Sequence, residues 1–377
     1  MYIRRLVQKT IEAKLFSHNV IVIYGPRQSG KTTMVKNILE PFADAGLYWN
    51  CEDPDIFSLL KSFEVEKIRQ FFIGKRIVVF DEAQRIPNIG MLLKLLFDTY
   101  PDTQYIATGS SSFELSQQVG EPLVGRSWEF TLYPFGISEV VSEKLAFIKV
   151  LDTVLVYGTY PEIWHLPNDE KEVKLKTIAS QYLYKDLLVF EGIRNSTVLQ
   201  DLLKLLAGQL GNEVSYNELA TILGTSRQTV IRYIDILEKS FVIFRLPTYV
   251  RNVRGRVGKK FKAYFYDLGI RNTIVNQFGI IDPLARNDVG ALWENFCILE
   301  RRKFFSYEGK NVTSYFWRGR VGEVDYLEEA NGKISAFEFK WNAGKRAVPP
   351  VAFERAAHPE SFVTVHKENF FQELLQL

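Results

Sequence analysis

Short, uninterrupted apolar runs alternate with helical patterns in the first third of the chain. The runs Val20–Tyr24 and Ile77–Phe80 contain no polar alternation, so they predict strands that are buried on both faces of a parallel sheet. Further strands are expected at 46–50 and 104–110, and the first of these separates the two apolar runs. After the second apolar run and before the strand at 104–110, residues 91–100 carry apolar side chains at the spacing of one helical face. The pattern predicts an α/β fold, with a parallel sheet covered by helices on both faces.

The loop after the first apolar run fits the P-loop template Gly-x-x-x-x-Gly-Lys-Ser/Thr. Its glycines let backbone N–H groups turn onto phosphate oxygens at a helix N-terminus, which favours anions. Lys31 is expected to reach the β- and γ-phosphates of ATP, and Thr32 to place its hydroxyl on Mg²⁺, while the helix runs to Leu39. The predicted nucleotide-binding residues are Gly25, Pro26, Arg27, Gln28, Ser29, Gly30, Lys31, Thr32 and Thr33.

Two acidic residues follow the second apolar run directly, as at the end of a Walker B strand. Asp81 is expected to orient Mg²⁺, and Glu82 to polarise the water that attacks the γ-phosphate. A solvated strand end is the alternative interpretation of this pair. The strand at 104–110 resembles a sensor 1 strand, so the hydroxyl of Ser110, or that of Thr108, is expected at the same site. The alternative there is a serine-rich turn.

These motifs together resemble the bacterial and archaeal AAA+ ATPases that carry a C-terminal domain of unassigned function. The resemblance rests on residues 25–33, on Phe-Asp-Glu-Ala-Gln at 80–84, and on the segments at 108–112, 125–126, 132–135, 157–162, 264–269 and 292–295. It extends over nearly the whole chain. In such ATPases an arginine after sensor 1 acts across a subunit interface, which implies that Arg126 is an arginine finger of a homo-oligomer. A plain surface ion pair is the alternative for Arg126.

Composition agrees with a multidomain protein of the cytoplasm. At 377 residues the chain is too long for one typical core, and its 46% hydrophobic and 24% charged residues are ordinary for a soluble protein. No segment approaches the ~20 apolar residues of a membrane span. The N-terminal residues lack an apolar signal core, so export is not expected. Cys51 and Cys297 suit a reducing compartment and form no metal motif.

The middle of the chain predicts a winged helix-turn-helix. A short helix after Ser215 ends at Gly224, a second helix spans 227–239, and a strand follows at 241–246. A basic hairpin comes next, with Arg251, Arg254, Arg256, Lys259, Lys260 and Lys262. Such a module binds either DNA or a protein partner. The formal net charge of only +3 does not indicate a nucleic-acid binder, and a basic run alone is often only a solvated hairpin.

Near the C-terminus, strands at 321–327 and 334–340 flank an Asn-Gly turn. Strand alternation places Glu338 and Lys340 on one face, and Asp325 is expected beside them. Asp, a hairpin and Glu-x-Lys resemble the PD-(D/E)xK nuclease core, in which the acids bind Mg²⁺ and the lysine activates water. Glu294, or Glu300, is expected to supply a further acid. An exposed cross-strand ion pair, or a nuclease fold without chemistry, is the alternative.

The sequence thus predicts three modules: an AAA+ ATPase at 1–140, a helical and winged-helix segment at 141–260, and a nuclease-like α/β domain at 261–377. The predicted function is ATP hydrolysis with Mg²⁺, coupled to DNA binding or processing. The predicted catalytic residues are Lys31, Asp81, Glu82, Ser110, Arg126, Asp325, Glu338 and Lys340. The alternative function is an ATP-driven switch or scaffold that docks a protein partner and has a catalytically silent C-terminal domain.

Overall fold

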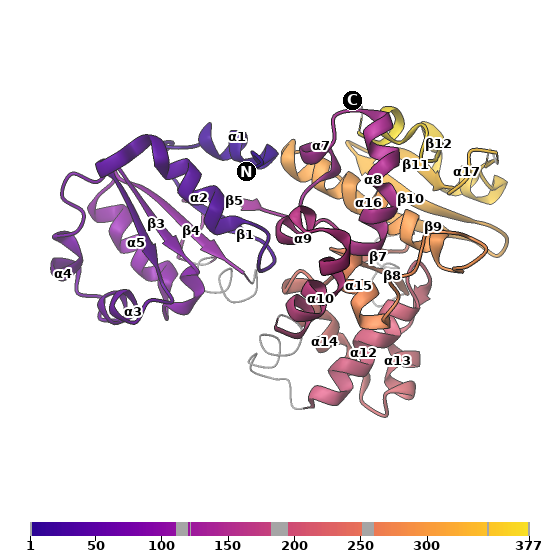
Figure 1. Ribbon diagram of the computed structural model, residues 1–377, viewed down its shortest axis with the longest axis horizontal. Helices are drawn as coiled ribbons and strands as arrows, with labels where there is room; N and C mark the ends of the chain where they lie inside the picture. Colours follow the sequence, from indigo (N-terminus) through magenta and orange to yellow (C-terminus); the bar gives the residue numbers. More distant parts are fainter. Residues whose placement is uncertain are drawn as a thin grey trace. The chain divides into compact units, whose positions relative to one another are not determined.

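The computed structural model describes residues 2–110, 120, 122–181, 195–250, 260–344 and 347–375. The chain forms two compact units (Figure 1). The N-terminal unit comprises Met1–Phe135 with Lys239–Phe241, and the C-terminal unit comprises Gly136–Glu238 with Val242–Leu377.

The N-terminal unit is built on a parallel sheet with the strand order β2-β3-β4-β1-β5. Its strands are β1 (Val20–Tyr24), β2 (Gly46–Asn50), β3 (Ile77–Asp81), β4 (Gln104–Gly109) and β5 (Ser127–Thr131). The predicted parallel α/β architecture is therefore confirmed. The order in the sheet differs from the order in the chain, because β4, not β2, lies between β1 and β3, and β2 forms an edge.

Helices pack along this sheet (Figure 1). They are α1 (Leu6–Glu12), α2 (Lys31–Leu39), α3 (Pro54–Lys61), α4 (Val65–Arg69) and α5 (Ile89–Thr99), with short 3₁₀ turns at Glu40–Ala45 and Ala83–Arg85. All residues of β1, β3 and β4 are buried, and α5 adds Leu92, Leu93 and Leu96 to the core. Because the strands are parallel, their carboxyl ends meet at one edge of the sheet, where the three motif segments follow.

The C-terminal unit begins with helices and contains two sheets. Its helices are α7 (Ile137–Val140), α8 (Lys144–Tyr157), α9 (Pro161–His165), α10 (Asn168–Ala179), α12 (Ser196–Gly208), α13 (Tyr216–Ile222), α14 (Arg227–Lys239), α15 (Leu268–Val275), α16 (Val289–Tyr307) and α17 (Val351–Ala357), followed by a π-helical turn at Phe371–Leu375. A small antiparallel sheet has the order β6-β8-β7, from β6 (Glu213–Val214), β7 (Ile243–Pro247) and β8 (Phe261–Phe265). Within the described ranges, no helix combines the length and the apolar character that crossing a membrane requires.

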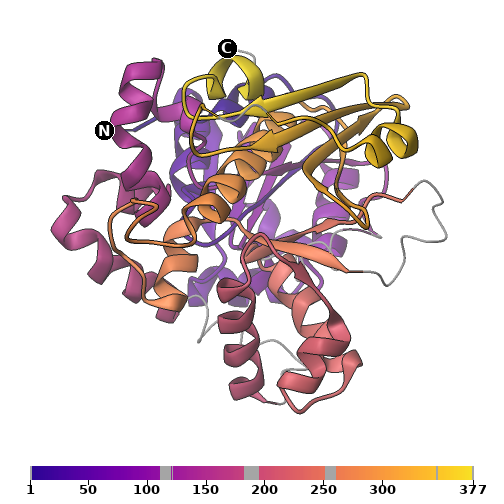
Figure 2. The ribbon, with the colours of Figure 1, turned by 90° about the vertical axis from the view of Figure 1, so that its right-hand side faces the viewer.

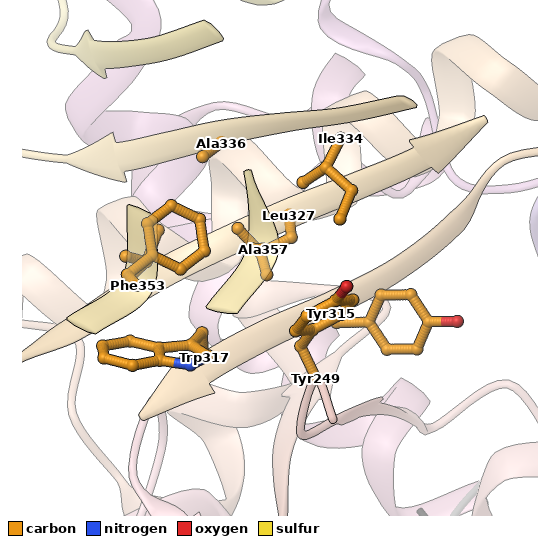
Figure 3. Packing of buried hydrophobic residues seen from close by; sticks show 9 residues of the cluster. Tyr249, Tyr315, Trp317, Leu327, Ile334, Ala336, Phe353 and Ala357 are labelled. Atoms are coloured by element: carbon orange, nitrogen blue, oxygen red, sulfur yellow. The ribbon is translucent and has the colours of Figure 1, made fainter. Parts of the chain in front are cut away.

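The second sheet has the order β12-β11-β10-β9 (Figure 2). It consists of β9 (Thr313–Arg318), β10 (Glu323–Ala330), β11 (Lys333–Phe339) and β12 (Ser361–Val365), with only β11 and β12 parallel. Asn331 and Gly332 both have positive φ, at 53° and 77°, so the Asn-Gly hairpin turn is confirmed. Tyr249, Trp317, Leu327 and Phe353 belong to a buried apolar cluster between the sheet and α17 (Figure 3).

Two motifs from distant parts of the sequence lock together in this unit. Asp267 caps α15 by accepting a hydrogen bond from Ile270 N at 3.1 Å, and its other oxygen accepts one from Thr159 N at 2.8 Å. A Cβ on Gly158 would lie 2.1 Å from Asp267 Oδ1, and Gly158 has φ +72°, so only glycine fits there. The segments at 157–162 and 264–269 therefore have a structural reason for their composition.

Asn295, in the segment 292–295, has a structural role in the C-terminal unit. Its side-chain amide donates to Phe265 O at 3.0 Å, and its Oδ1 accepts from Phe265 N at 2.8 Å. The buried amide of Asn295 thus acts as the partner that the last residue of β8 would otherwise lack. This pair of bonds fixes α16 against the small sheet.

Candidate functional site

The loop 25–33 has the backbone that a phosphate-binding turn requires. A Cβ on Gly25 would lie 2.1 Å from Leu132 O, so this position accepts no side chain. Gly30 has φ 96° and is the N-cap of α2, whose first residue is Lys31. The hydroxyl of Ser29 is buried and has no hydrogen-bond partner among the residues that the structure describes. The backbone of the loop and the unpaired hydroxyl of Ser29 are therefore both suited to bind a phosphate group.

Lys31 lies inside the loop. Its Nζ donates to Gly25 O at 2.8 Å and to Pro26 O at 3.0 Å, and the side chain is buried. Burial lowers the pKa of Lys31, and the nearby carboxylates of Glu82 and Asp81 partly oppose that shift. A phosphate would supply the negative charge that a buried ammonium needs.

Asp81 is the centre of a hydroxyl-carboxylate network at the carboxyl ends of β1, β3 and β4. Its Oδ2 accepts from Thr32 Oγ1 at 2.7 Å and from the hydroxyl of Tyr48 at 2.6 Å. Its Oδ1 accepts from Thr108 Oγ1. A threonine hydroxyl and a carboxylate held together at a P-loop are the ligand types that suit Mg²⁺. Tyr48 was not predicted, because its contact with Asp81 joins β2 to β3 and leaves no motif in the sequence.

Glu82 is connected to the sensor strand through Gln84. Gln84 Nε2 donates to Glu82 Oε2 at 2.6 Å and to Ser110 Oγ at 3.0 Å. Glu82 itself has φ 52°, in the left-handed region, and its N–H donates to Thr108 Oγ1 at 3.1 Å. Ser110 therefore reaches the acidic pair through an amide, whereas Thr108 bonds Asp81 directly. The fifth residue of Phe-Asp-Glu-Ala-Gln was visible in the sequence, but its bridging role was not.

Arg5 supports the loop from the N-terminal segment. Its guanidinium donates to Ser29 O at 2.8 Å and to Tyr133 O at 2.7 Å, and its Cζ lies 4.8 Å from the centre of the Phe135 ring. The side chain is buried. Arg5 thus ties the P-loop to the segment after β5, a long-range contact without a sequence signal.

The remaining loop residues lie toward the surface or on α2. Arg27 comes within 3.9 Å of Glu52, which also pairs with Arg85 at 2.9 Å. Gln28 has φ 61°. Thr33 lines an open cavity of about 530 Å³ with Lys36 and Tyr48.

Arg126 lies at the amino end of the parallel strands, whereas the P-loop follows the carboxyl end of β1. It precedes β5, its carbonyl accepts from Val20 N at 2.8 Å, and its guanidinium is 3.2 Å from Asp98 Oδ2. Because β1 and β5 are parallel, Val20 and the loop after Tyr24 mark opposite ends of the strand. Arg126 therefore serves no P-loop of its own chain, and a role as finger requires a second copy.

The predicted C-terminal residues lie near one another in the C-terminal unit. Lys340 Nζ donates to Glu338 Oε1 at 2.6 Å, so the shared face of these two residues is confirmed. Asp325 Oδ2 accepts from Phe339 N at 2.9 Å. Burial raises the pKa of Glu338, as does the charge of Asp325, and burial also raises the pKa of Asp325. Glu338 Oε2 is buried without a hydrogen-bond partner in the described part of the chain.

Glu294, which was expected to supply the further acid, is paired with a lysine. Lys262 Nζ donates to Glu294 Oε1 at 2.9 Å, and the hydroxyl of Tyr264 bonds the same oxygen. Burial, with Asp325, raises the pKa of Glu294 to about 7. Glu300, the alternative, accepts from Ile137 N at 2.7 Å and from Lys303, so each of its carboxylate oxygens has a partner of its own.

The described carboxylates of the C-terminal unit do not form a metal centre as they stand. Among the residues with described positions, no group of three His, Cys, Asp or Glu side chains is arranged to hold a metal ion. The charge of Asp325 acts on both Glu294 and Glu338. These three predicted ligands are nevertheless not arranged to bind one ion. Lys262 also differs from its prediction: it is buried in β8 and does not belong to a solvated basic loop.

The predicted helix-turn-helix segment contains its two helices and its glycine turn. Gly224 has φ 60° between α13 and α14, and Ser226 Oγ accepts from Thr229 N at 3.1 Å. Arg227 and Arg232 are exposed on α14, while Val230 is buried. The predicted basic hairpin lies outside the described residues from 251 to 259; Lys260 after it is exposed and pairs with Glu213 at 3.3 Å.

Separate regions of the chain match known families. Residues 17–141 match the family described as AAA domain. Residues 148–279 match a domain of unknown function (DUF8612), and residues 289–374 match another, DUF4143. The chain thus combines a P-loop ATPase-like region with a C-terminal domain of a second kind.

Relatives with similar extent occur in archaea and bacteria. An uncharacterised protein of Methanocaldococcus jannaschii is 26% identical over 348 residues, which cover 86% of this chain and 75% of the relative. An uncharacterised protein of Mycobacterium tuberculosis is 26% identical over 344 residues, which cover 89% and 74%.

Among solved structures, a Pif1 helicase from Candida albicans is 17% identical over 57% of this chain and 56% of that chain, with a TM-score of 0.28. At that score the likeness carries no inference. The AAA domain match, together with the geometry of the loop 25–33, supports nucleotide binding and ATPase activity in the N-terminal unit.

Proposed function

We propose that this chain is a Mg²⁺-dependent ATPase whose nucleotide cycle acts on DNA. The observation that carries the ATPase part is the hydrogen-bond network that joins Thr32, Asp81 and Thr108 at the mouth of the P-loop. It places a hydroxyl and a carboxylate side by side where the loop would hold the β- and γ-phosphates. The parallel sheet supplies the rigid support on which these residues are fixed.

Each residue has a distinct task in this proposal. The loop N–H groups and Lys31 bind the phosphates, and Lys31 exchanges its bonds to Gly25 O and Pro26 O for phosphate oxygens. Thr32 and Asp81 would hold Mg²⁺, which neutralises charge on the phosphates. Glu82 accepts the proton of the attacking water, while Gln84 fixes its carboxylate relative to Ser110.

Arg126 is proposed to act in a neighbouring copy of the chain. Arg126 lies at the amino end of the strands, and its pairing with Asp98 is exposed, so its guanidinium is accessible to a second subunit. An arginine supplied across an interface stabilises the charge of the transition state. The proposal therefore includes a homo-oligomer in the ATP-bound state, which size-exclusion chromatography with a non-hydrolysable ATP analogue would detect.

The DNA part rests on the segment from α13 to β8. Arg227 and Arg232 are exposed on α14, whose glycine turn and capped start resemble a recognition helix, and Lys260 lies exposed before β8. The basic hairpin predicted between β7 and β8 would add phosphate contacts. We therefore assign this segment as the DNA-binding element of the proposal.

The experiment that tests this proposal is a steady-state ATPase assay with and without single- and double-stranded DNA. Stimulation or inhibition by DNA in wild type, and its absence in an Arg227→Glu/Arg232→Glu variant with unchanged basal rate, is the expected result. An ATPase rate that no form of DNA changes would remove the DNA part. Failure to hydrolyse ATP at all with Mg²⁺ would remove the ATPase part.

A second candidate function is an ATP-driven switch or scaffold that docks a protein partner. It is favoured by the C-terminal carboxylates, which pair with lysines and do not form a three-ligand group among the described residues. Cleavage of nucleic acid by Asp325, Glu338 and Lys340 remains a prediction, and we derive no step for it. Nicking of labelled DNA in Mn²⁺ that is lost in Asp325→Ala would favour the nuclease over the scaffold.

A further inference from the structure

The C-terminal carboxylates surround an ammonium group of the chain itself. The side chain of Lys262, in β8, is 2% exposed. Its Nζ donates to Glu294 Oε1 of α16 at 2.9 Å and lies 2.5 Å from Glu323 Oε1 of β10. Asp325 is near enough for its charge to act on the same ammonium. The ammonium is therefore buried between carboxylates of the C-terminal unit.

The elements around this ammonium complete its enclosure. The Phe316 ring of β9 lies 5.4 Å from Lys262 Nζ, which is the geometry of a cation-π contact. The hydroxyl of Tyr264 bonds Glu294, and Arg318 comes within 3.1 Å of the second oxygen of Glu323. Each carboxylate that faces Lys262 thus has a further donor that holds it in place.

The position of Lys262 conflicts with metal binding. Mg²⁺ and Mn²⁺ take several oxygen ligands at short distances, and Glu294 and Asp325 are two of the three acids predicted for that role. A divalent cation among the same oxygens would stand next to an ammonium that cannot leave the buried strand without losing its partners. The lysine and the metal therefore exclude each other.

We propose that Lys262 is a resident cation that keeps the carboxylate cluster of Glu294, Glu323 and Asp325 closed to divalent metal, so that this cluster binds Mg²⁺ or Mn²⁺ only when the Lys262 charge is removed. The inference concerns the C-terminal unit and goes beyond the proposed ATPase. It holds or fails whether or not ATP hydrolysis responds to DNA.

The test measures Mn²⁺ binding by electron paramagnetic resonance in the full chain without nucleotide. An Asp81→Asn background removes the carboxylate of the ATPase site, so that bound Mn²⁺ reports on the C-terminal unit. We expect no detectable binding in this background and one bound Mn²⁺ in Lys262→Met, a gain in affinity of at least about tenfold, which corresponds to ~1.4 kcal/mol. Adding Glu294→Gln to Lys262→Met should abolish the gain.

Lys260→Met is the matched control, because it removes a lysine charge two residues away whose side chain is 60% exposed and pairs with Glu213 outside the cluster. It should gain no Mn²⁺. The proposal is overturned if the background protein already binds Mn²⁺ as tightly as Lys262→Met and loses it in Asp325→Asn. It is equally overturned if a folded Lys262→Met binds none, because then the lysine blocks no metal site.

If Lys262→Met does not fold, the wild-type chain still decides the question through amine acylation read by mass spectrometry. Exposed Lys333 and Lys149 serve as reactive references. Lys262 should stay unmodified both with and without Mn²⁺. Acylation of Lys262 that appears when Mn²⁺ is added would show that metal displaces the ammonium, which contradicts a closed cluster.

Discussion

At the scale of single residues, ATP binding and ATP hydrolysis depend on different side chains. Lys31 lies inside the P-loop, whereas Glu82 lies beyond Asp81 and is held by Gln84. We expect Lys31→Ala to weaken ATP binding and Glu82→Gln to bind ATP yet lower kcat by ~10²-fold or more, the contribution of a positioned base. Titration with a fluorescent ATP analogue and steady-state kinetics separate the two. Equal turnover of Glu82→Gln and wild type would end the assignment of Glu82 as base.

Gln84 carries the second prediction at this scale. Gln84→Leu removes the amide that bonds Glu82 at 2.6 Å and Ser110 at 3.0 Å, while it keeps a side chain of similar size. We expect kcat to fall on the order of tenfold, a part of the effect of the base itself, with KM for ATP unchanged. Ser110→Ala is the matched control, since it removes only one of the two bonds, and should lose less. A rise in KM with constant kcat would mean that Gln84 serves binding.

Residues whose role depends on local sequence were predictable, and residues that act through long-range contacts were not. The P-loop, Asp81 and Glu82 were predictable because their chemistry is local: a strand, a turn and its next residues carry the whole signal. Gln84, Tyr48 and Arg5 act through contacts between distant segments, and an alternation pattern has no information about those. Lys262 shows the same limit, because a charge count placed it in a solvated loop while its partners on α16 and β10 bury it.

At the scale of elements, the strands were predictable and their order was not. Uninterrupted runs such as Ile77–Phe80 identify buried strands, but the sheet order depends on which crossover packs where, so the place of β4 between β1 and β3 had no sequence signal. The hairpin of β10 and β11 is the opposite case. Its Asn-Gly turn demands positive φ at both residues, and that local requirement fixed the pairing.

The start of α15 carries a prediction about pH. Burial raises the pKa of Asp267 from 3.8 to about 6, although backbone hydrogen bonds from Thr159 and Ile270 oppose the shift. The folded chain then binds the proton more tightly than the unfolded chain. The stability contributed by the protonated form is complete below pH 3.8 and is lost as the pH rises through about 6.

Asp267→Asn should remove this dependence. The amide cannot titrate, so the free energy of unfolding of the C-terminal unit should lose a decline of up to about 1.4 kcal/mol per pH unit in that window. The variant should also be less stable throughout by ~1 kcal/mol, because the amide nitrogen cannot accept the hydrogen bond from Thr159 N. Urea unfolding of wild type and variant across the window measures both effects. Parallel pH profiles would show that Asp267 does not titrate there.

At the scale of the whole molecule, the chain joins two units with different chemistry. The N-terminal unit presents its P-loop network at one edge of a parallel sheet. The C-terminal unit buries paired charges such as Lys262 and Glu294, and Arg301 with Glu328, in places where a simple core would be apolar. Buried pairs of this kind cost desolvation and are weak evidence for stability alone, so the C-terminal unit is the part in which a specific binding function should be sought.

Binding of DNA by the whole chain would be visible in its salt dependence. Each phosphate contact that is lost should make the slope of log K against log[salt] shallower by about 0.9. We therefore expect Arg251→Glu/Arg254→Glu to shift the slope for duplex DNA by nearly two, and Lys149→Glu, at an exposed position of α8, to leave it unchanged. Fluorescence anisotropy with labelled duplex over a salt series measures the slopes. If the double variant and the Lys149→Glu control give the wild-type slope, the basic segment contacts no phosphate, and the chain acts through a protein partner instead.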